Sequence, residues 1–123
     1  MNWGAMAAFA LALAVALGAF GAHGLRDRLN EYSTGIYEKA VFYHFVHALG
    51  LLAVAILARL GHLSASAGSW SSWLLAGGIV FFSGSLYLLA VTGQRWLGAV
   101  TPIGGVMFIA GWLVLAWGLA AAR

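Results

Sequence analysis

The chain has 123 residues, of which 63% are hydrophobic and 7% charged, and it contains no Cys. Soluble domains are roughly 45–50% apolar and about 25% charged, so this composition excludes a water-soluble globular protein. The lack of Cys excludes disulfides, thiolate zinc sites and iron–sulfur clusters. The formal charge of +3 comes without a basic patch interleaved with aromatic residues, so we expect no nucleic acid partner. The lipid bilayer is the expected partner.

Four apolar runs predict four transmembrane helices, at residues 3–25, 38–60, 71–92 and 96–122. A helix of about 20 residues crosses the roughly 30 Å hydrocarbon core, and each run is long enough to do so. The connections are short, and none has room for a second domain. The sequence therefore predicts an all-α integral membrane protein, in which residues 1–123 form a single four-transmembrane-helix bundle with both termini on one side.

The ends of the runs give three further expectations. The first run has no basic segment before it and is longer than a signal peptide core of about 7–15 residues, so we expect a retained helix. Pro102 is tolerated in a first helical turn, which favours an interfacial lead-in at 96–100 followed by the last helix. The Lys and Arg count, four against two, places the 26–37 connection in the cytoplasm.

The second run has two distinct faces when its residues are placed at 100° per residue. In a bilayer a bulky apolar face contacts lipid, and a small or polar face packs against other helices. The expected inward face comprises Tyr37, Ala40, His44, His47, Ala48, Leu51, Ala55 and Ala58, and the outward face Phe42, Val46, Leu49, Ala53, Leu57 and Leu60. Both imidazoles are therefore expected inside the bundle.

The first run is small on two sides, which suggests a helix that is packed on both. One side carries Ala7, Ala14, Gly18 and Gly21. The other, called here the Ala stripe, is Ala5, Ala8, Ala12, Ala16 and Ala19, and it leads to His23. In the last run, small residues recur every seven positions and predict a groove for a partner helix in the same protomer or another: Gly104, Gly111 and Gly118.

Polar residues gather toward the end of the bundle that holds the 26–37 connection. The candidate intramembrane polar pocket consists of His23, His44, His47, Ser83, Ser85 and Thr101. Imidazoles there could relay protons or ligate a metal or haem, but no acidic neighbour orients them and no His-Glu-x-x-His motif is present. The other interpretation is that they hydrogen-bond across helices. We expect no metal, no cofactor and no catalytic residues, because Ser83-Gly84-Ser85 lacks a nucleophile elbow and an orienting acid.

Four segments in this order resemble a known family: GAFGAHGL at 18–25, YHFVHAL at 43–49, FSGSLY at 82–87 and TPIGG at 101–105. Over nearly its whole length the chain is similar to the domain-of-unknown-function 423 family, whose eukaryotic relatives are called transmembrane protein 256. The resemblance implies a small multi-pass protein, in bacteria of the inner membrane, with no established activity. The residues that match the family pattern are His23, His47, Ser83, Ser85, Thr101 and Pro102, whereas His44 follows it less closely.

Three classes of function are open at this point. The leading one is a non-enzymatic membrane protein that packs against a second copy of itself or a larger membrane complex. The second is a small transporter, or a proton or ligand carrier, that uses the polar pocket. The third is a haem- or quinone-associated redox subunit.

Overall fold

The structure of the chain is a computed structural model that describes residues 1–122. Its elements are helical: α1 (Trp3–His23), α2 (Glu31–Arg59), α3 (Ala65–Gly78), the π-helix η1 (Ile79–Gly84), α4 (Ser85–Thr92), the 3₁₀-helix η2 (Arg95–Ala99) and α5 (Thr101–Ala121). Because α3, η1 and α4 run on as one helix, the elements make four segments long and apolar enough to cross a membrane. The predicted fold class, an all-α membrane protein with four spans, is confirmed.

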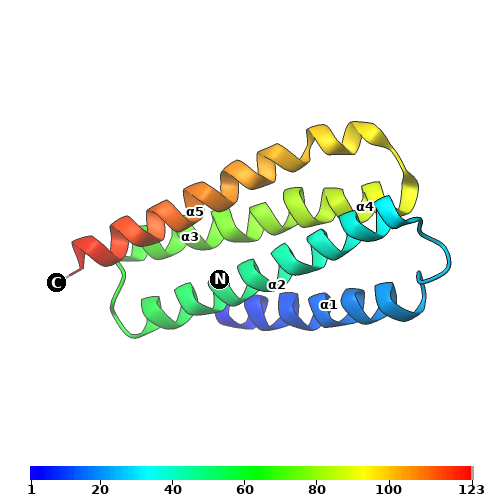
Figure 1. The fold of residues 1–123 in the computed structure, drawn as a ribbon. Helices are drawn as coiled ribbons and strands as arrows, with labels where there is room; N and C mark the ends of the chain where they lie inside the picture. Colours follow the sequence, from blue (N-terminus) through cyan, green and yellow to red (C-terminus); the bar gives the residue numbers. More distant parts are fainter. Residues whose placement is uncertain (123) are drawn as a thin grey trace.

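The four spans run antiparallel, with both termini toward one end (Figure 1). At that end Asn2 lines the same groove as Arg59, and Ala122 lines the same groove as Gly61. The connection from α1 to α2 and the turn from α4 to η2 lie at the other end (Figure 1). Gly61 and Gly93 have φ of 82° and 72°, a left-handed conformation that glycine adopts at little cost.

The spans are arranged side by side in chain order, with α1 and α5 at the two edges (Figure 1). Helix α1 packs against α2, which in turn packs against α3, η1 and α4, while α5 packs against α3 and η1. Only Ala7 and Ala14 of α1 are buried. The first span is therefore peripheral, and most of its surface faces outward.

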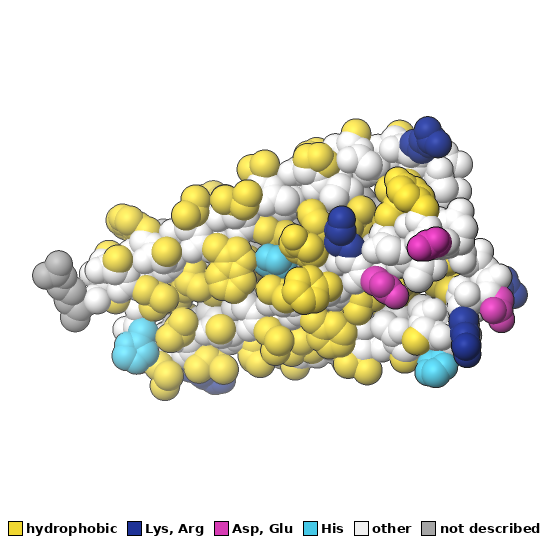
Figure 2. Space-filling view, in the orientation of Figure 1, with side chains coloured by type: hydrophobic (Ala, Val, Ile, Leu, Met, Phe, Trp, Pro, Cys, Tyr) yellow, Lys and Arg dark blue, Asp and Glu magenta, His cyan; other side chains and the backbone are white. Residues whose placement is uncertain are grey.

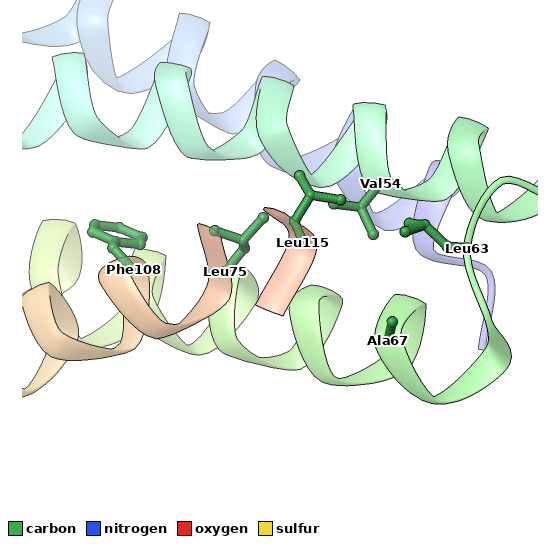
Figure 3. Close-up of a cluster of buried hydrophobic side chains, with 6 residues drawn as sticks. All are labelled: Val54, Leu63, Ala67, Leu75, Phe108 and Leu115. Carbon is green, nitrogen blue, oxygen red and sulfur yellow. The ribbon is translucent and has the colours of Figure 1, made fainter. Parts of the chain in front are cut away.

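Three spans contribute to the main hydrophobic core, which lies between α2, α3 and α5 (Figure 3). Its buried members are Val54, Leu63, Ala67, Leu75, Phe108 and Leu115. In lipid such a core is held by close packing and interhelical hydrogen bonds, because hydrocarbon outside the bundle is as apolar as the interior. Small residues that allow backbones to approach therefore matter as much as large ones.

Two helices begin earlier than the sequence predicted. Helix α2 begins at Glu31 and not at 38, because the Asn30 side chain accepts a 2.8 Å hydrogen bond from the Ser33 N–H and caps the helix. Helix α3 begins at Ala65 and not at 71, because Ser64 caps it through a 3.1 Å bond from the Ala67 N–H. Hydropathy alone missed these polar first turns.

The other predicted ends differ less. Helix α1 ends at His23, and α5 ends at Ala121. The expected lead-in before α5 takes the form of η2, and Pro102 lies in the first turn of α5, where its missing N–H leaves no bond unmade. The π-helix was not predicted.

The face of the bundle seen in Figure 2 carries apolar side chains along most of its length, as a lipid-facing surface requires. Lys, Arg, Asp and Glu gather mainly at the end where α1 joins α2 and α4 joins η2 (Figure 2). That end is a polar boundary, suited to the membrane interface.

Candidate functional site

His47 is buried between α2 and α5. Its Nδ1–H donates a 2.7 Å hydrogen bond to the Tyr43 carbonyl, one turn earlier on α2. The ring lies parallel to Phe108 of α5, with ring centroids 3.4 Å apart and an interplanar angle of 11°. The His47 ring is thus packed between α2 and α5. The hydrogen bond within α2 and the stacking on Phe108 fix its position.

His44 connects α2 to α4. Its Nδ1 lies 2.8 Å from the Tyr87 hydroxyl, and the two rings meet edge to face. The residue is 2% exposed, and its Nε2 has no hydrogen-bond partner within residues 1–122. A neutral imidazole that accepts from Tyr87 at Nδ1 carries its hydrogen on Nε2.

Small residues on α1 allow a side chain of α2 to contact the α1 backbone. The Tyr37 hydroxyl donates a hydrogen bond to the Leu17 carbonyl. Gly21, one turn further on, makes this approach possible, because a Cβ there would lie 2.8 Å from Cδ1 of Tyr37. The α1–α2 interface is therefore closed by a hydrogen bond from a side chain of α2 to a backbone carbonyl of α1.

Ser83 in η1 and Ser85 at the start of α4 attach the third span to its two neighbours. The Ser83 hydroxyl donates a 2.8 Å bond to the Ala40 carbonyl of α2, and Ser83 is fully buried. The Ser85 hydroxyl lies 2.9 Å from the Phe82 carbonyl and 2.7 Å from Oγ1 of Thr101, at the start of α5. Residues two apart on a helix point to nearly opposite sides, so the two hydroxyls meet different helices, and the end of η1 is a polar junction of three spans.

Five of the six predicted pocket residues are buried or half-buried, but they do not converge on one cavity. Hydrogen bonds from His44, from Ser83 and between Ser85 and Thr101 each join two helices, whereas His47 bonds within α2 and reaches α5 by stacking on Phe108. The three grooves described on residues 1–122 are lined by other residues. These side chains are arranged to hold helices together, which agrees with the hydrogen-bonding interpretation.

His23 lies apart from the others, contrary to expectation. It is exposed at the end of α1, as is the Ala stripe that leads to it. The buried side of α1 is the one that carries Ala7 and Ala14, since these are the residues that meet α2. The sequence shows two small faces on this helix and does not say which of them α2 covers.

The inward face predicted for α2 is buried from Tyr37 to Leu51, while Ala55 is half-buried and Ala58 is exposed. Three tyrosines were missing from the candidate set although they make its contacts: Tyr37, Tyr43 and Tyr87. Same-face spacing is the signal that could have found them, because Tyr43 precedes His47 by one turn and Tyr87 follows Ser83 by one turn.

The three glycines of α5 contact α3, η1 and the loop before α3 within the same chain. A Cβ on Gly104 would lie 2.7 Å from the Phe81 carbonyl carbon, and one on Gly118 would lie 2.8 Å from Cβ of Ala67. At Gly111 the nearest atom is Cδ2 of Leu75, at 3.0 Å. The predicted groove exists, and its partner is the third span of this protomer.

No group of three or more His, Cys, Asp or Glu within residues 1–122 is placed to share a metal ion. His44 and His47 each have Nδ1 engaged by a neighbouring residue. Two polar atoms in the described part of the chain are buried without a partner, Nε2 of His44 and the Ser71 hydroxyl oxygen.

Comparison with known proteins finds one family of membrane proteins. The family model described as "Protein of unknown function (DUF423)" matches residues 17–105. A UPF0382 membrane protein of Staphylococcus epidermidis is 54% identical over 103 residues, covering 84% of this chain and 82% of the relative. The UPF0382 membrane protein YwdK of Bacillus subtilis is 48% identical over 104 residues, covering 84% and 83%.

No solved structure matches this chain. The matched region runs from the last two turns of α1 to the start of α5 and so contains every residue of the predicted polar pocket. The relatives carry the name of membrane proteins, and the four spans fit a multi-pass protein of the cell membrane. The chain belongs to the DUF423 family of membrane proteins of unknown biochemical activity.

Proposed function

We propose that this protein is a non-enzymatic accessory component of the membrane, which packs against a further transmembrane helix through the outward face of α1. The observation that carries the proposal is the Ala stripe: Ala5, Ala8, Ala12, Ala16 and Ala19 are all exposed. Lipid-facing surfaces are usually bulky, whereas runs of small residues are typical of helix contacts. A stripe of five alanines with no helix over it fits an interface whose partner is another molecule.

The use of the polar groups supports the same conclusion. The hydroxyls of Ser83 and Ser85 and Nδ1 of His44 and His47 bond to neighbouring residues. A transporter or carrier needs polar groups that face a passage or a ligand cavity, and a haem protein needs a free imidazole nitrogen beside a cavity of suitable size. The bonds of His44, Ser83 and Ser85 connect helices of this chain and that of His47 stays within α2, so both alternatives have less support than a packing role.

Oxidative cross-linking in native membranes tests the proposal, because the chain has no Cys of its own. Ala12→Cys places a thiol in the middle of the Ala stripe. The matched control is Val106→Cys, which places a thiol on the lipid-facing side of α5, where Val106 is 66% exposed. We expect a cross-linked species from Ala12→Cys and none from the control. A homodimer would identify a second copy as the partner, and a single adduct with another membrane protein would identify a larger complex.

Steric blocking gives an independent measurement. Ala12→Leu adds bulk on the exposed stripe without touching α2, so the protomer should fold normally while the assembly dissociates. The size of the complex in mild detergent should fall to that of a monomer. If the size stays unchanged and both thiol variants remain uncross-linked, the outward face of α1 contacts only lipid and the proposed function is wrong.

A further inference from the structure

A groove lies between the second half of α1 and the first half of α2, on a different side of α1 from the Ala stripe. Its volume is about 570 Å³, within the range of roughly 300–1,000 Å³ typical of small-molecule sites. Gly18 and Gly21 contribute to it from α1, and Phe45 and Leu49 contribute from α2. Phe42 and Leu49 line the same groove and are 64% and 54% exposed, so its apolar wall is open toward the membrane.

The part of the groove below its charged residues matches one leaflet. The groove lines α2 from Thr34 to Leu49, and the part from Glu38 to Leu49 has a helical rise of about 16 Å. Half of a hydrocarbon core of roughly 30 Å is about 15 Å. An acyl chain that entered at the polar end would therefore reach the deep end near the middle of the bilayer.

The polar end of the groove carries one positive and one negative side chain. Arg26, just beyond α1, and Glu38, on the second turn of α2, both line it and are both exposed. Thr34 adds a hydroxyl at the same end. A guanidinium binds phosphate through paired N–H donors, and a carboxylate accepts hydrogen bonds from an ammonium group. The mouth thus presents complementary partners for a zwitterionic head group.

We infer that this groove binds one phospholipid whose head group carries both a phosphate and a primary ammonium. The acyl chain lies along Gly18, Phe45 and Leu49, the phosphate contacts Arg26 and the ammonium contacts Glu38. The site is separate from the outward face of α1, so it does not depend on the proposed function. A lipid with a phosphate alone leaves Glu38 without a partner, and a trimethylammonium head has no N–H to donate to it.

Native mass spectrometry of the intact protein, released from vesicles, tests the inference. The vesicles contain equal amounts of phosphatidylethanolamine, phosphatidylglycerol and phosphatidylcholine with matched acyl chains. We expect the phosphatidylethanolamine adduct of the wild type to exceed the other two by about tenfold, the ratio that one charge-assisted hydrogen bond supplies. Equal occupancy by the three lipids would overturn the inference.

Two charge variants with matched controls separate the head-group contacts. Glu38→Gln should abolish the preference for phosphatidylethanolamine over phosphatidylcholine, while Glu31→Gln, on the exposed first turn of the same helix and outside the groove, should keep it. Arg26→Gln should reduce all three adducts, while Lys39→Gln, also outside the groove, should not. If the paired variants behave alike, the charges at the mouth do not select the lipid.

A third variant tests the apolar part. Ala22 is exposed and lines the groove, so Ala22→Phe fills it from the side of α1. The control is Ala116→Phe, on the exposed side of α5. We expect Ala22→Phe to reduce lipid adducts about tenfold and the control to leave them unchanged. If the wild type forms a dimer that carries no bound lipid, a second copy occupies the groove. That result would contradict the inference.

Discussion

Gly104 of α5 lies directly against the backbone of Phe82 in η1: a Cβ on Gly104 would be 2.7 Å from the Phe82 Cα. The neighbouring Gly105 is different, because its Cβ would lie 3.7 Å from Cδ2 of the same residue, an ordinary contact. Two adjacent glycines therefore have different roles. Only the first one allows the π-helix and α5 to approach.

Gly104→Ala is expected to destabilise the protein by about 1–3 kcal/mol, the range for overpacking a site that cannot yield. Gly105→Ala should have little effect or increase stability, since Ala is favoured over Gly in a helix interior by about 1 kcal/mol. Unfolding in mixed detergent micelles measures both. Equal losses for the two variants would show that the contact with Phe82 is not tight.

The π-helix also shows what the sequence could not predict. The burial of Tyr37, His44 and His47 was predicted correctly from periodicity, because in a bilayer the small or polar side of a helix must face other helices. The spacing of Gly104, Gly111 and Gly118 also predicted a groove for a partner helix, and these glycines lie close to the third span and the loop before it. The sequence could not predict the widened turn at 79–84, nor that Ser83 bonds to α2 and Ser85 to α5, since that depends on where three helices meet.

The exposure of His23 was not predicted, for a different reason. Its helix has small residues on both sides, so residue type alone does not determine which side is covered. The choice is made by the α1–α2 contact, in which Gly21 admits the ring of Tyr37. Two equally small faces can be distinguished only when the side chains opposite them are known.

Ser83→Ala removes the buried hydrogen bond to the Ala40 carbonyl. Interhelical hydrogen bonds in membrane proteins contribute about 0.6 kcal/mol on average and up to about 1.7 kcal/mol. We expect a loss in the upper part of this range, because Ser83 is fully buried. Ser66→Ala, at an exposed position on the first turn of α3, is the control and should change stability by less than about 0.5 kcal/mol. A loss no larger than that of the control would show that the bond contributes nothing.

The contact between His44 and Tyr87 is expected to couple α2 to α4. A double-mutant cycle with His44→Leu and Tyr87→Phe should give an interaction energy of about 0.6–1.7 kcal/mol, because any cost of repacking at either position cancels in the cycle. The same cycle with His47→Leu in place of His44→Leu is the control, since His47 bonds to Tyr43 and not to Tyr87. Equal coupling in the two cycles would exclude a specific bond.

The last prediction concerns the arrangement of the spans in the membrane. Asp27 lies in the connection between α1 and α2, His62 lies in the loop between α2 and α3, and both are exposed. Because α2 crosses the bilayer between them, Asp27→Cys and His62→Cys should be accessible to an impermeant thiol reagent from opposite sides. The excess of Lys and Arg near the first connection predicts that position 27 is cytoplasmic. In intact cells stripped of their wall, the reagent should label position 62 at once and position 27 only after permeabilisation. The reverse order would invert the orientation, and labelling of both positions from one side would show that α2 does not cross the membrane.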